Sequence, residues 1–312
     1  MPPYVVRAAD KTVEVWSGKR IQPGKETADT WQSELKSEVR EAFLQLGIRP
    51  GSLLAGHYNS TSPTVVDTDT ENSLFTNMKE TMSAALFTAL RFERGVCAPP
   101  PGPKPIDLVS GHLHYYRYTV GGSWTTWERD QIVAHWRHIP RRVAVGTDTA
   151  RPVWFALRQA NTNGAVCVVA DEPLPPTTNF GVRINVHTAP SRSHRPTANS
   201  EFVIDGAIAA FHNDPLSDAL TASLLPRLPG VTEAEFRHAM SSLAGPLFET
   251  PAVSISAGGS AQISPADHRC LLGEYTVDCD SNSRWPEFSG ELFTIRPVTS
   301  PTTTPRPALI NS

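Results

Sequence analysis

The stretch 112-HLHYYRYTV-120 is the clearest β-strand in the sequence, and the rest of the chain is best interpreted outward from it. Side chains alternate between the two faces of a strand. One face of this strand therefore collects polar and aromatic residues, namely His112, His114, Tyr116 and Tyr118. Gly121-Gly122 then turns the chain toward residues 124–127, which predicts a hairpin.

Other segments rich in β-branched and aromatic residues also predict strands. They are residues 4–7, 12–16, 52–58, 165–170, 180–187, 271–277 and 291–295. The first two are separated by Asp10-Lys11 and form a second expected hairpin. The segment 165–170 is apolar throughout, which is typical of a buried strand.

Helical periodicity appears between these strands. It predicts a helix after Asp29 with an apolar stripe from Trp31 to Leu46, ended by Gly47, and a second helix from Glu71 through Leu90. Later helices are expected at 153–160, at 202–211, after Asp214-Pro215, and after Thr232, where Glu235 completes a capping box.

The order of these elements mixes runs of strands with runs of helices, which favours an α+β fold with mixed or antiparallel sheets and several packed helices. Proline-rich loops are expected at 97–105 and 171–178. The chain is expected to divide into α+β halves at 1–170 and 171–296, unless 1–296 is one domain. Residues 297–312 are rich in Ser, Thr and Pro and predict a disordered tail.

Composition narrows the class of protein. The 312 residues are 39% hydrophobic and 19% charged, as in a globular protein, and the net charge of −3 offers no general basic surface for nucleic acid. None of the four cysteines forms a C-x-x-C pair, which predicts reduced thiols. We expect no secretion signal and no membrane span, and therefore a soluble, cytoplasmic protein.

The first candidate site is the acidic segment between the strand at 52–58 and the second helix. Asp67, Asp69 and Glu71 stand at alternate positions there. Carboxylate oxygens suit hard cations, so these three residues are candidate ligands for Mg²⁺ or Mn²⁺. The alternative is structural, because Asp69 or Thr70 would also be an ordinary helix N-cap and Glu71 would complement the helix dipole.

Two further sets of residues could act with such a metal. His112 and His114 share a strand face and could be metal ligands or an acid–base pair, although a half-exposed strand also accommodates such residues. Arg141 and Arg142 follow the segment 136–140 and could bind a substrate phosphate, unless they lie in a solvated loop. Asp267-His268 could supply a general base, but its spacing is unspecific.

Motifs of several large enzyme classes are missing, including the P-loop, the dinucleotide fingerprint, the G-x-S-x-G elbow and H-E-x-x-H. The remaining residues predict a divalent-metal-dependent hydrolase acting on a phosphate ester or nucleic acid. The alternative is a non-enzymatic protein-binding module that uses Tyr116, Tyr118, Trp124 and Trp127 as a contact surface. The partner is then either a phosphate-bearing substrate or another protein.

Overall fold

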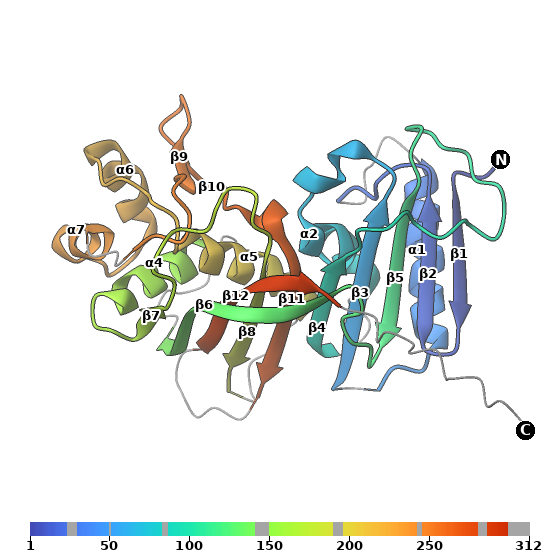
Figure 1. Cartoon of the computed structure of the whole chain (residues 1–312), viewed down its shortest axis with the longest axis horizontal. Helices are drawn as coiled ribbons and strands as arrows, with labels where there is room; N and C mark the ends of the chain where they lie inside the picture. The colour runs from blue at the N-terminus through green and yellow to red at the C-terminus, as the bar shows by residue number, and fades with distance from the viewer. Residues whose placement is uncertain are drawn as a thin grey trace, which may run out of the picture.

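The computed structural model describes residues 1–23, 30–49, 51–82, 87–140, 150–189, 196–241, 245–279 and 286–298, and its elements form a large sheet covered by helices (Figure 1). The strands are β1 (Tyr4–Ala9), β2 (Thr12–Ser17), β3 (Ser52–Ser60), β4 (Phe87–Arg94), β5 (His114–Val120), β6 (Trp127–Pro140), β7 (Val166–Val168), β8 (Phe180–His187), β9 (Val253–Ile255), β10 (Ala261–Ile263), β11 (Cys270–Asp278) and β12 (Glu287–Pro297). The helices are α1 (Thr30–Gln45), α2 (Thr70–Leu74), α3 (Lys79–Met82), α4 (Ala150–Asn161), α5 (Pro196–Ala209), α6 (Asp218–Leu224) and α7 (Glu233–Ser241). Short 3₁₀ turns lie at η1 (Pro63–Asp67), η2 (Thr76–Met78), η3 (Leu225–Arg227) and η4 (Asp267–Arg269).

Ten strands form one mixed sheet in the order β1-β2-β5-β3-β4-β11-β8-β12-β6-β7, and β9 and β10 form a separate hairpin. Neighbours are antiparallel except for two parallel pairs, β3 with β4 and β8 with β11. The α+β fold expected from the sequence is therefore confirmed.

The two sides of this sheet repeat the same topology about the central pair β4 and β11. Outward from the centre, β4, β3, β5 and β2 correspond to β11, β8, β12 and β6, with the same relative orientations within each set. The connections correspond too, since α1 precedes β3 as α4 precedes β8, and helices follow both β3 and β8. Because β4 and β11 are antiparallel, the two sets are related by a local twofold axis through the middle of the sheet.

One face of the sheet carries the core. Val13 and Val15 of β2, Tyr116 and Tyr118 of β5, and Leu54 of β3 are fully buried beneath helices such as α1 and α2. The opposite face carries charged side chains that pair across strands. Arg183 bonds Glu291 at 3.0 Å and lies 3.7 Å from Glu274, which also contacts Arg91.

Most of the expected elements are confirmed, including the first hairpin, the helix that ends at Gly47 and the strands at 52–58, 180–187 and 271–277. The capping box is also confirmed, because the Thr232 hydroxyl accepts from Glu235 N at 3.2 Å and the Glu235 carboxylate accepts from Thr232 N at 2.8 Å. Asp29 lies outside the described residues.

Three expected elements are wrong in extent or partner. The helix predicted from Glu71 to Leu90 breaks into α2, η2 and α3, and Leu90 belongs to strand β4. The residues after Gly121-Gly122 do not form a hairpin with β5, since β6 pairs with β12 and β7 at the far side of the sheet. The helix expected at Asp214-Pro215 begins instead at Asp218 with Ser217 as its N-cap, because Asp214 is held by Arg158.

The remaining expectations concern the whole chain. The domain division at residue 170 stays a prediction; within the sheet, β6 and α4 belong to the second topological set. Pro297, which was expected to begin the disordered tail, is the last residue of β12, and residues 299–312 lie outside the described part. All four cysteines are free thiols, and no helix within the described ranges has the length and apolar character needed to cross a membrane.

The two topological sets meet where β4 pairs with β11, and the close packing there requires a glycine, Gly273. A Cβ atom on Gly273 of β11 would lie 2.3 Å from Cζ of Phe92 on β4, so any side chain there would displace the buried ring. We expect Gly273→Ala to destabilise the protein by about 1–3 kcal/mol, the usual cost of overpacking a core. Thermal melts check this, with Gly111→Ala as the contrasting variant: no atom lies within 4 Å there, so any loss reflects its φ of +73° alone. A Gly273→Ala protein as stable as the parent would contradict the close packing.

Candidate metal centre

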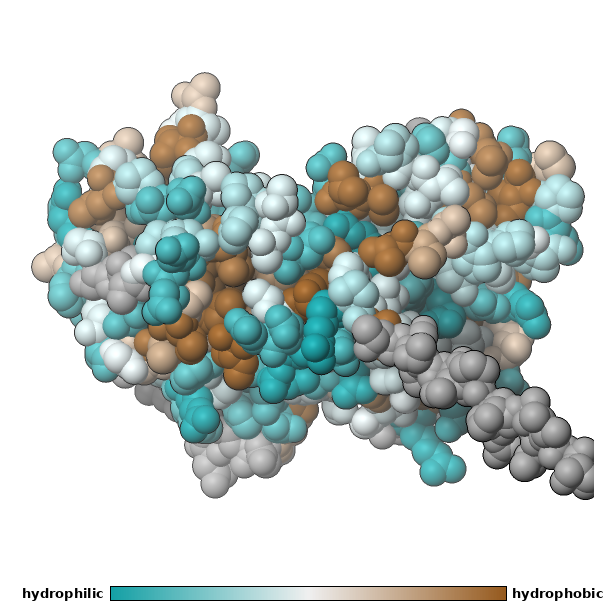
Figure 2. Space-filling model, viewed as in Figure 1, coloured by the Kyte–Doolittle hydropathy of each residue, from teal (hydrophilic) through white to brown (hydrophobic). Residues whose placement is uncertain are grey.

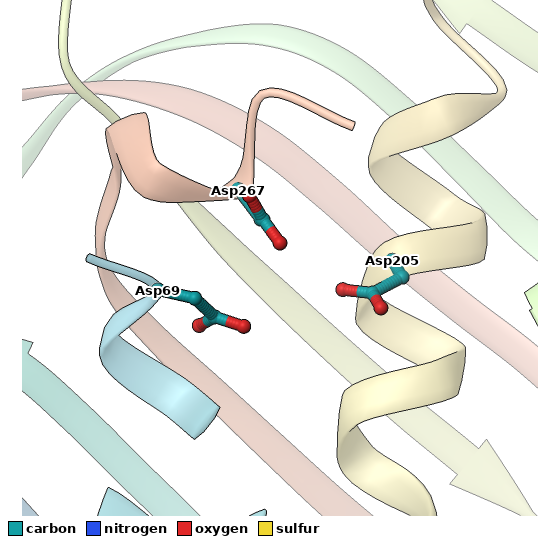
Figure 3. Close-up of side chains that lie close together, drawn as sticks. All are labelled: Asp69, Asp205 and Asp267. Carbon is teal, nitrogen blue, oxygen red and sulfur yellow. The ribbon is translucent and has the colours of Figure 1, made fainter. Parts of the chain in front are cut away.

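Three aspartates from distant parts of the sequence converge beside the central strands of the sheet, where β3 and β4 end and β11 begins. Asp69 lies just before α2, Asp205 lies in the middle of α5, and Asp267 begins η4. One carboxylate oxygen from each residue lies within 4.8 Å of the others. Figure 3 shows the three side chains pointing toward a common space, and all three are half-buried. Figure 2 shows the surface indented at this place, between α2 and the hairpin of β9 and β10.

Local structure explains the position of two of these residues. Asp69 is the N-cap of α2 and accepts a hydrogen bond from Asn72 N at 3.1 Å, so the capping role expected from the sequence is confirmed. Asp267 accepts a hydrogen bond from His268 N at 2.7 Å through Oδ1. Each carboxylate therefore keeps one oxygen that these bonds do not use.

Asp205 has no such local role. It is a lone acidic residue in the apolar run 203-VIDGAIAA-210, whose other side chains pack in the core. Its carboxylate makes no hydrogen bond or ion pair with any residue that the structure describes. Placing an unpartnered carboxylate against two others is costly unless a proton or a cation compensates the charge.

Arg94 holds together the two loops that carry Asp69 and Asp267. It ends β4 and is 6% exposed. Its Nη1 donates to the carbonyl oxygens of Val65 at 2.7 Å and Thr68 at 2.8 Å, and its Nη2 donates to that of His268 at 3.1 Å. One guanidinium thus fixes the backbone next to two of the three aspartates.

The pKa values of the three aspartates reflect this crowding. Burial raises the pKa of Asp69 more than the hydrogen bonds from Asn72 and the charge of Arg20 lower it. Burial, followed by the charges of Asp69 and Asp267, raises the pKa of Asp205 well above its usual value. Burial and the charge of Asp69 raise the pKa of Asp267 to about 7. In the absence of a cation, the folded protein therefore holds protons here near neutral pH.

The other two predicted metal ligands are not among the three converging aspartates. Asp67 is exposed at the end of η1. Glu71 is 3% exposed and accepts hydrogen bonds from Ser200 Oγ at 2.5 Å and Thr76 Oγ1 at 3.2 Å. Burial and the charge of Asp69 raise the pKa of Glu71 to about 8. Glu71 is thus a carboxyl group that borders the aspartates and ties α2 to α5.

The histidines lie at the start of β5, which is next to the end of β3. His114 is 6% exposed, and its Nδ1 lies 3.0 Å from the hydroxyl of Tyr58. Burial, together with the charges of Arg20 and His112, lowers the pKa of His114 to about 4, so its imidazole is neutral at pH 7. His112 is half-buried outside β5. Arg141 and Arg142 lie outside the described residues.

Two polar groups near the aspartates lack partners within the described part of the chain. The Nε atom of Arg20 is buried and makes no hydrogen bond, and the charge of this residue acts on both Asp69 and His114. The hydroxyl of Thr70, which follows Asp69 directly, is also buried without a partner. Buried donors in folded proteins almost always have a partner, so these two can bond to an ordered water or to a bound ligand.

Sequence reasoning found Asp69, considered Asp267 without assigning it to a metal, and missed Asp205. The signal for Asp205 was a single charged residue inside an apolar helix, which is rare unless the charge has a function or a partner. Comparisons with known proteins add no further residue. The chain matches no protein-family model, no curated protein and no solved structure.

Proposed function

We propose that this protein is a divalent-metal-dependent hydrolase acting on a phosphate ester, either small or within nucleic acid. The observation that carries the proposal is the convergence of Asp69, Asp205 and Asp267 from three separate segments. Their oxygen ligands suit Mg²⁺ or Mn²⁺, which usually bind a few carboxylates and leave positions for water and substrate phosphate. The negative charges of the three aspartates, which repel one another when no metal is bound, would then attract the cation.

Neighbouring residues have chemistry that fits this reaction. The unsatisfied Nε of Arg20 is a donor for a phosphate oxygen, and guanidinium groups bind phosphate well. His114 is neutral at pH 7 and is the candidate proton acceptor. Arg141 and Arg142 remain predicted phosphate-binding residues. The cytoplasmic location expected from the sequence belongs to the same proposal.

The alternative of a protein-binding module has less support. It requires an exposed aromatic surface, but Tyr116 and Tyr118 are fully buried and Trp127 is 8% exposed. Trp124 is half-buried beneath the guanidinium groups of Arg91 and Arg183, at 5.9 and 5.7 Å from the ring centre. These side chains pack within the protein and do not form a contact surface.

Thermal melts across pH test the metal centre. Asp267 has a pKa of 3.8 as an isolated group and about 7 in the folded protein, so the folded state binds the extra proton between these values. The free energy of unfolding of the metal-free protein should therefore fall as pH rises through this window. Mn²⁺ should raise Tm by several degrees at pH 8 and have little effect at pH 5, where protons compete with it.

Two aspartate variants sharpen this test. Asp171→Asn changes an exposed loop and should keep the full response to Mn²⁺. Asp67→Asn should keep it too, whereas loss of the response in Asp67→Asn would favour the ligand set expected from sequence. Hydrolysis of p-nitrophenyl phosphate and bis(p-nitrophenyl) phosphate, with and without Mn²⁺, tests the reaction. A parent protein whose Tm is indifferent to Mg²⁺ and Mn²⁺ at pH 8 would overturn the proposal.

A further inference from the structure

A pocket of about 430 Å³ lies on the face of the sheet opposite the core. It lies over β2, β5, β3 and β4, which are neighbours in the sheet (Figure 1). Its lining includes side chains that alternate with core residues, such as Arg117 between the buried Tyr116 and Tyr118. Pockets that bind small molecules usually have volumes of about 300–1,000 Å³, so this one is large enough for a small ligand.

Small side chains leave the space for this pocket. Thr12, Thr119 and Ala55 are register partners on β2, β5 and β3, and all three line the pocket. The adjacent row on the same face carries larger, polar side chains, one from each of four strands: Glu14, Arg117, His57 and Glu93. The pocket is therefore a gap in the sheet surface beside a row of charged groups.

Glu93 fixes the segment that closes one side of the pocket. It is 2% exposed, and its carboxylate accepts hydrogen bonds from Thr125 N at 2.9 Å, Thr125 Oγ1 at 2.6 Å and Thr126 N at 2.8 Å. Burial alone would raise the pKa of Glu93, but hydrogen bonds from His57, Thr125 and Thr126 outweigh it and hold the pKa below its usual value. The segment with Trp124, which also lines the pocket, is thereby held in place.

Arg117 and Glu14 bring opposite charges to the pocket without pairing with each other. They are directly opposed on β5 and β2, where Cβ atoms are about 5 Å apart, and both are half-buried. Arg117 makes no hydrogen bond or ion pair with any residue that the structure describes. Glu14 accepts from the Tyr115 hydroxyl at 2.6 Å through Oε1, and no described residue bonds to its Oε2. One guanidinium and one carboxylate oxygen are therefore available to a ligand.

The equivalent place in the second topological set differs in this respect. A pocket of about 370 Å³ lies there over β6, β12 and β8, which correspond to β2, β5 and β3. Its Arg183 pairs with Glu291 at 3.0 Å, and Glu291 also pairs with Arg129 at 2.5 Å. The arginine in that pocket is thus neutralised by a neighbouring strand, whereas Arg117 in the first set is not.

We propose that the pocket lined by Glu14 and Arg117 binds a free α-amino acid, with its carboxylate on Arg117 and its ammonium group on Glu14. A guanidinium fork matches a carboxylate, and an ammonium group is a donor for Glu14 Oε2. The two charged groups of an α-amino acid are attached to the same carbon atom, which suits charges on directly opposed side chains. Ala55 and Trp124 offer apolar surface to the ligand side chain.

The charges around the pocket argue against a phosphate or a dicarboxylate as the ligand. Asp10, Glu14 and Glu93 line it, and Arg117 is the one arginine among its lining residues. A ligand with two negative charges would be repelled there, whereas a zwitterion has a partner for each of its charges. This amino-acid site does not depend on the hydrolase reaction.

Calorimetric titration of the full chain at pH 7.5 with L-phenylalanine and with L-leucine tests the site. We expect both to bind with a Kd in the millimolar range or below and to raise Tm. Arg117→Met keeps the length of the side chain and should weaken binding at least about 10-fold, as expected for a lost hydrogen bond to a charged group. Arg7→Met is the matched control, because Arg7 is also opposed to Glu14 but is exposed and does not line the pocket.

Two analogues test the requirement for both charges. 3-Phenylpropionate lacks the ammonium group and 2-phenylethylamine lacks the carboxylate, so each should bind at least about 10-fold more weakly than L-phenylalanine. Asp205→Asn should bind the amino acids like the parent, so failure of the hydrolase proposal and failure of this site are distinguishable. The site is wrong if neither amino acid binds at millimolar concentration, if folded Arg117→Met keeps the parental affinity, or if either analogue binds as well as L-phenylalanine.

Discussion

Asp205→Asn is expected to abolish the response to Mg²⁺ and Mn²⁺ while making the metal-free protein more stable. Asparagine has nearly the same shape but carries no charge, so repulsion from Asp69 and Asp267 disappears. The variant should therefore melt at a higher temperature than the parent at pH 8, because asparagine avoids both the burial of a charge and the repulsion from the neighbouring carboxylates. Metal-dependent hydrolysis should fall more than about 100-fold, because even residues behind a metal ligand contribute 10–100-fold.

The measurement compares melts of the parent and Asp205→Asn at pH 5 and pH 8, with and without Mn²⁺. The stabilisation should be present at pH 8 and smaller at pH 5, where Asp267, with its pKa of about 7, already carries a proton. Asp171→Asn is the matched control, because it removes the same charge from an exposed loop. If Asp205→Asn lowers Tm at pH 8 and still responds to Mn²⁺, the cluster is not a metal centre.

Arg94→Met is expected to have the largest effect on stability. It removes the donor to one buried and two partly buried carbonyl oxygens on two loops. Each such loss costs about 1–3 kcal/mol, so the total should be on the order of 3 kcal/mol or more. Arg94→Lys keeps the charge but cannot reach both loops at once, and we expect it to fold with weakened metal binding.

The two substitutions distinguish a structural role from positioning of the metal ligands. Calorimetric titration of Arg94→Lys with Mn²⁺, at a temperature where it is fully folded, should give a Kd at least about 10-fold above that of the parent. Arg91→Lys is the control, because Arg91 lies on the same strand but pairs with Glu274 on the other face. Parental Mn²⁺ affinity in Arg94→Lys would show that the aspartates do not depend on this contact.

Periodicity predicted the strands well because alternation reflects burial of one face. The strand after Gly111 is the clearest case, since the buried Tyr116 and Tyr118 alternate with the half-buried Arg117 and Thr119. The predicted helix to Leu90 failed because Leu86 and Leu90 also suit a buried strand, and a run of spaced leucines does not distinguish the two. The order of the strands in the sheet could not be predicted from local sequence patterns. For example, β11 lies between β4 and β8 although it is far from β4 in the sequence.

The candidate site was predictable only in part for a related reason. Asp69 was visible as an acidic residue at a helix start, and its neighbours Asp67 and Glu71 were grouped with it by closeness in sequence. In the folded protein, Asp67 is exposed to solvent and Glu71 accepts a hydrogen bond from Ser200. The third carboxylate beside Asp69 and Asp267 is that of Asp205 in α5. A site assembled by tertiary packing has no sequence spacing of its own, so its members can be recognised only by features such as a charge in an apolar helix.

The twofold repeat of the sheet has a consequence for the origin of the chain. A single half that ended at an open β4 edge would have offered unpaired backbone groups to a second copy of itself, and an antiparallel match would have closed a symmetric homodimer. Two such copies joined in one chain would have the strand order seen here. The two sets of a single chain need not carry the same residues, so acidic residues can lie beside the ends of β3 and β4 while a histidine ends β8.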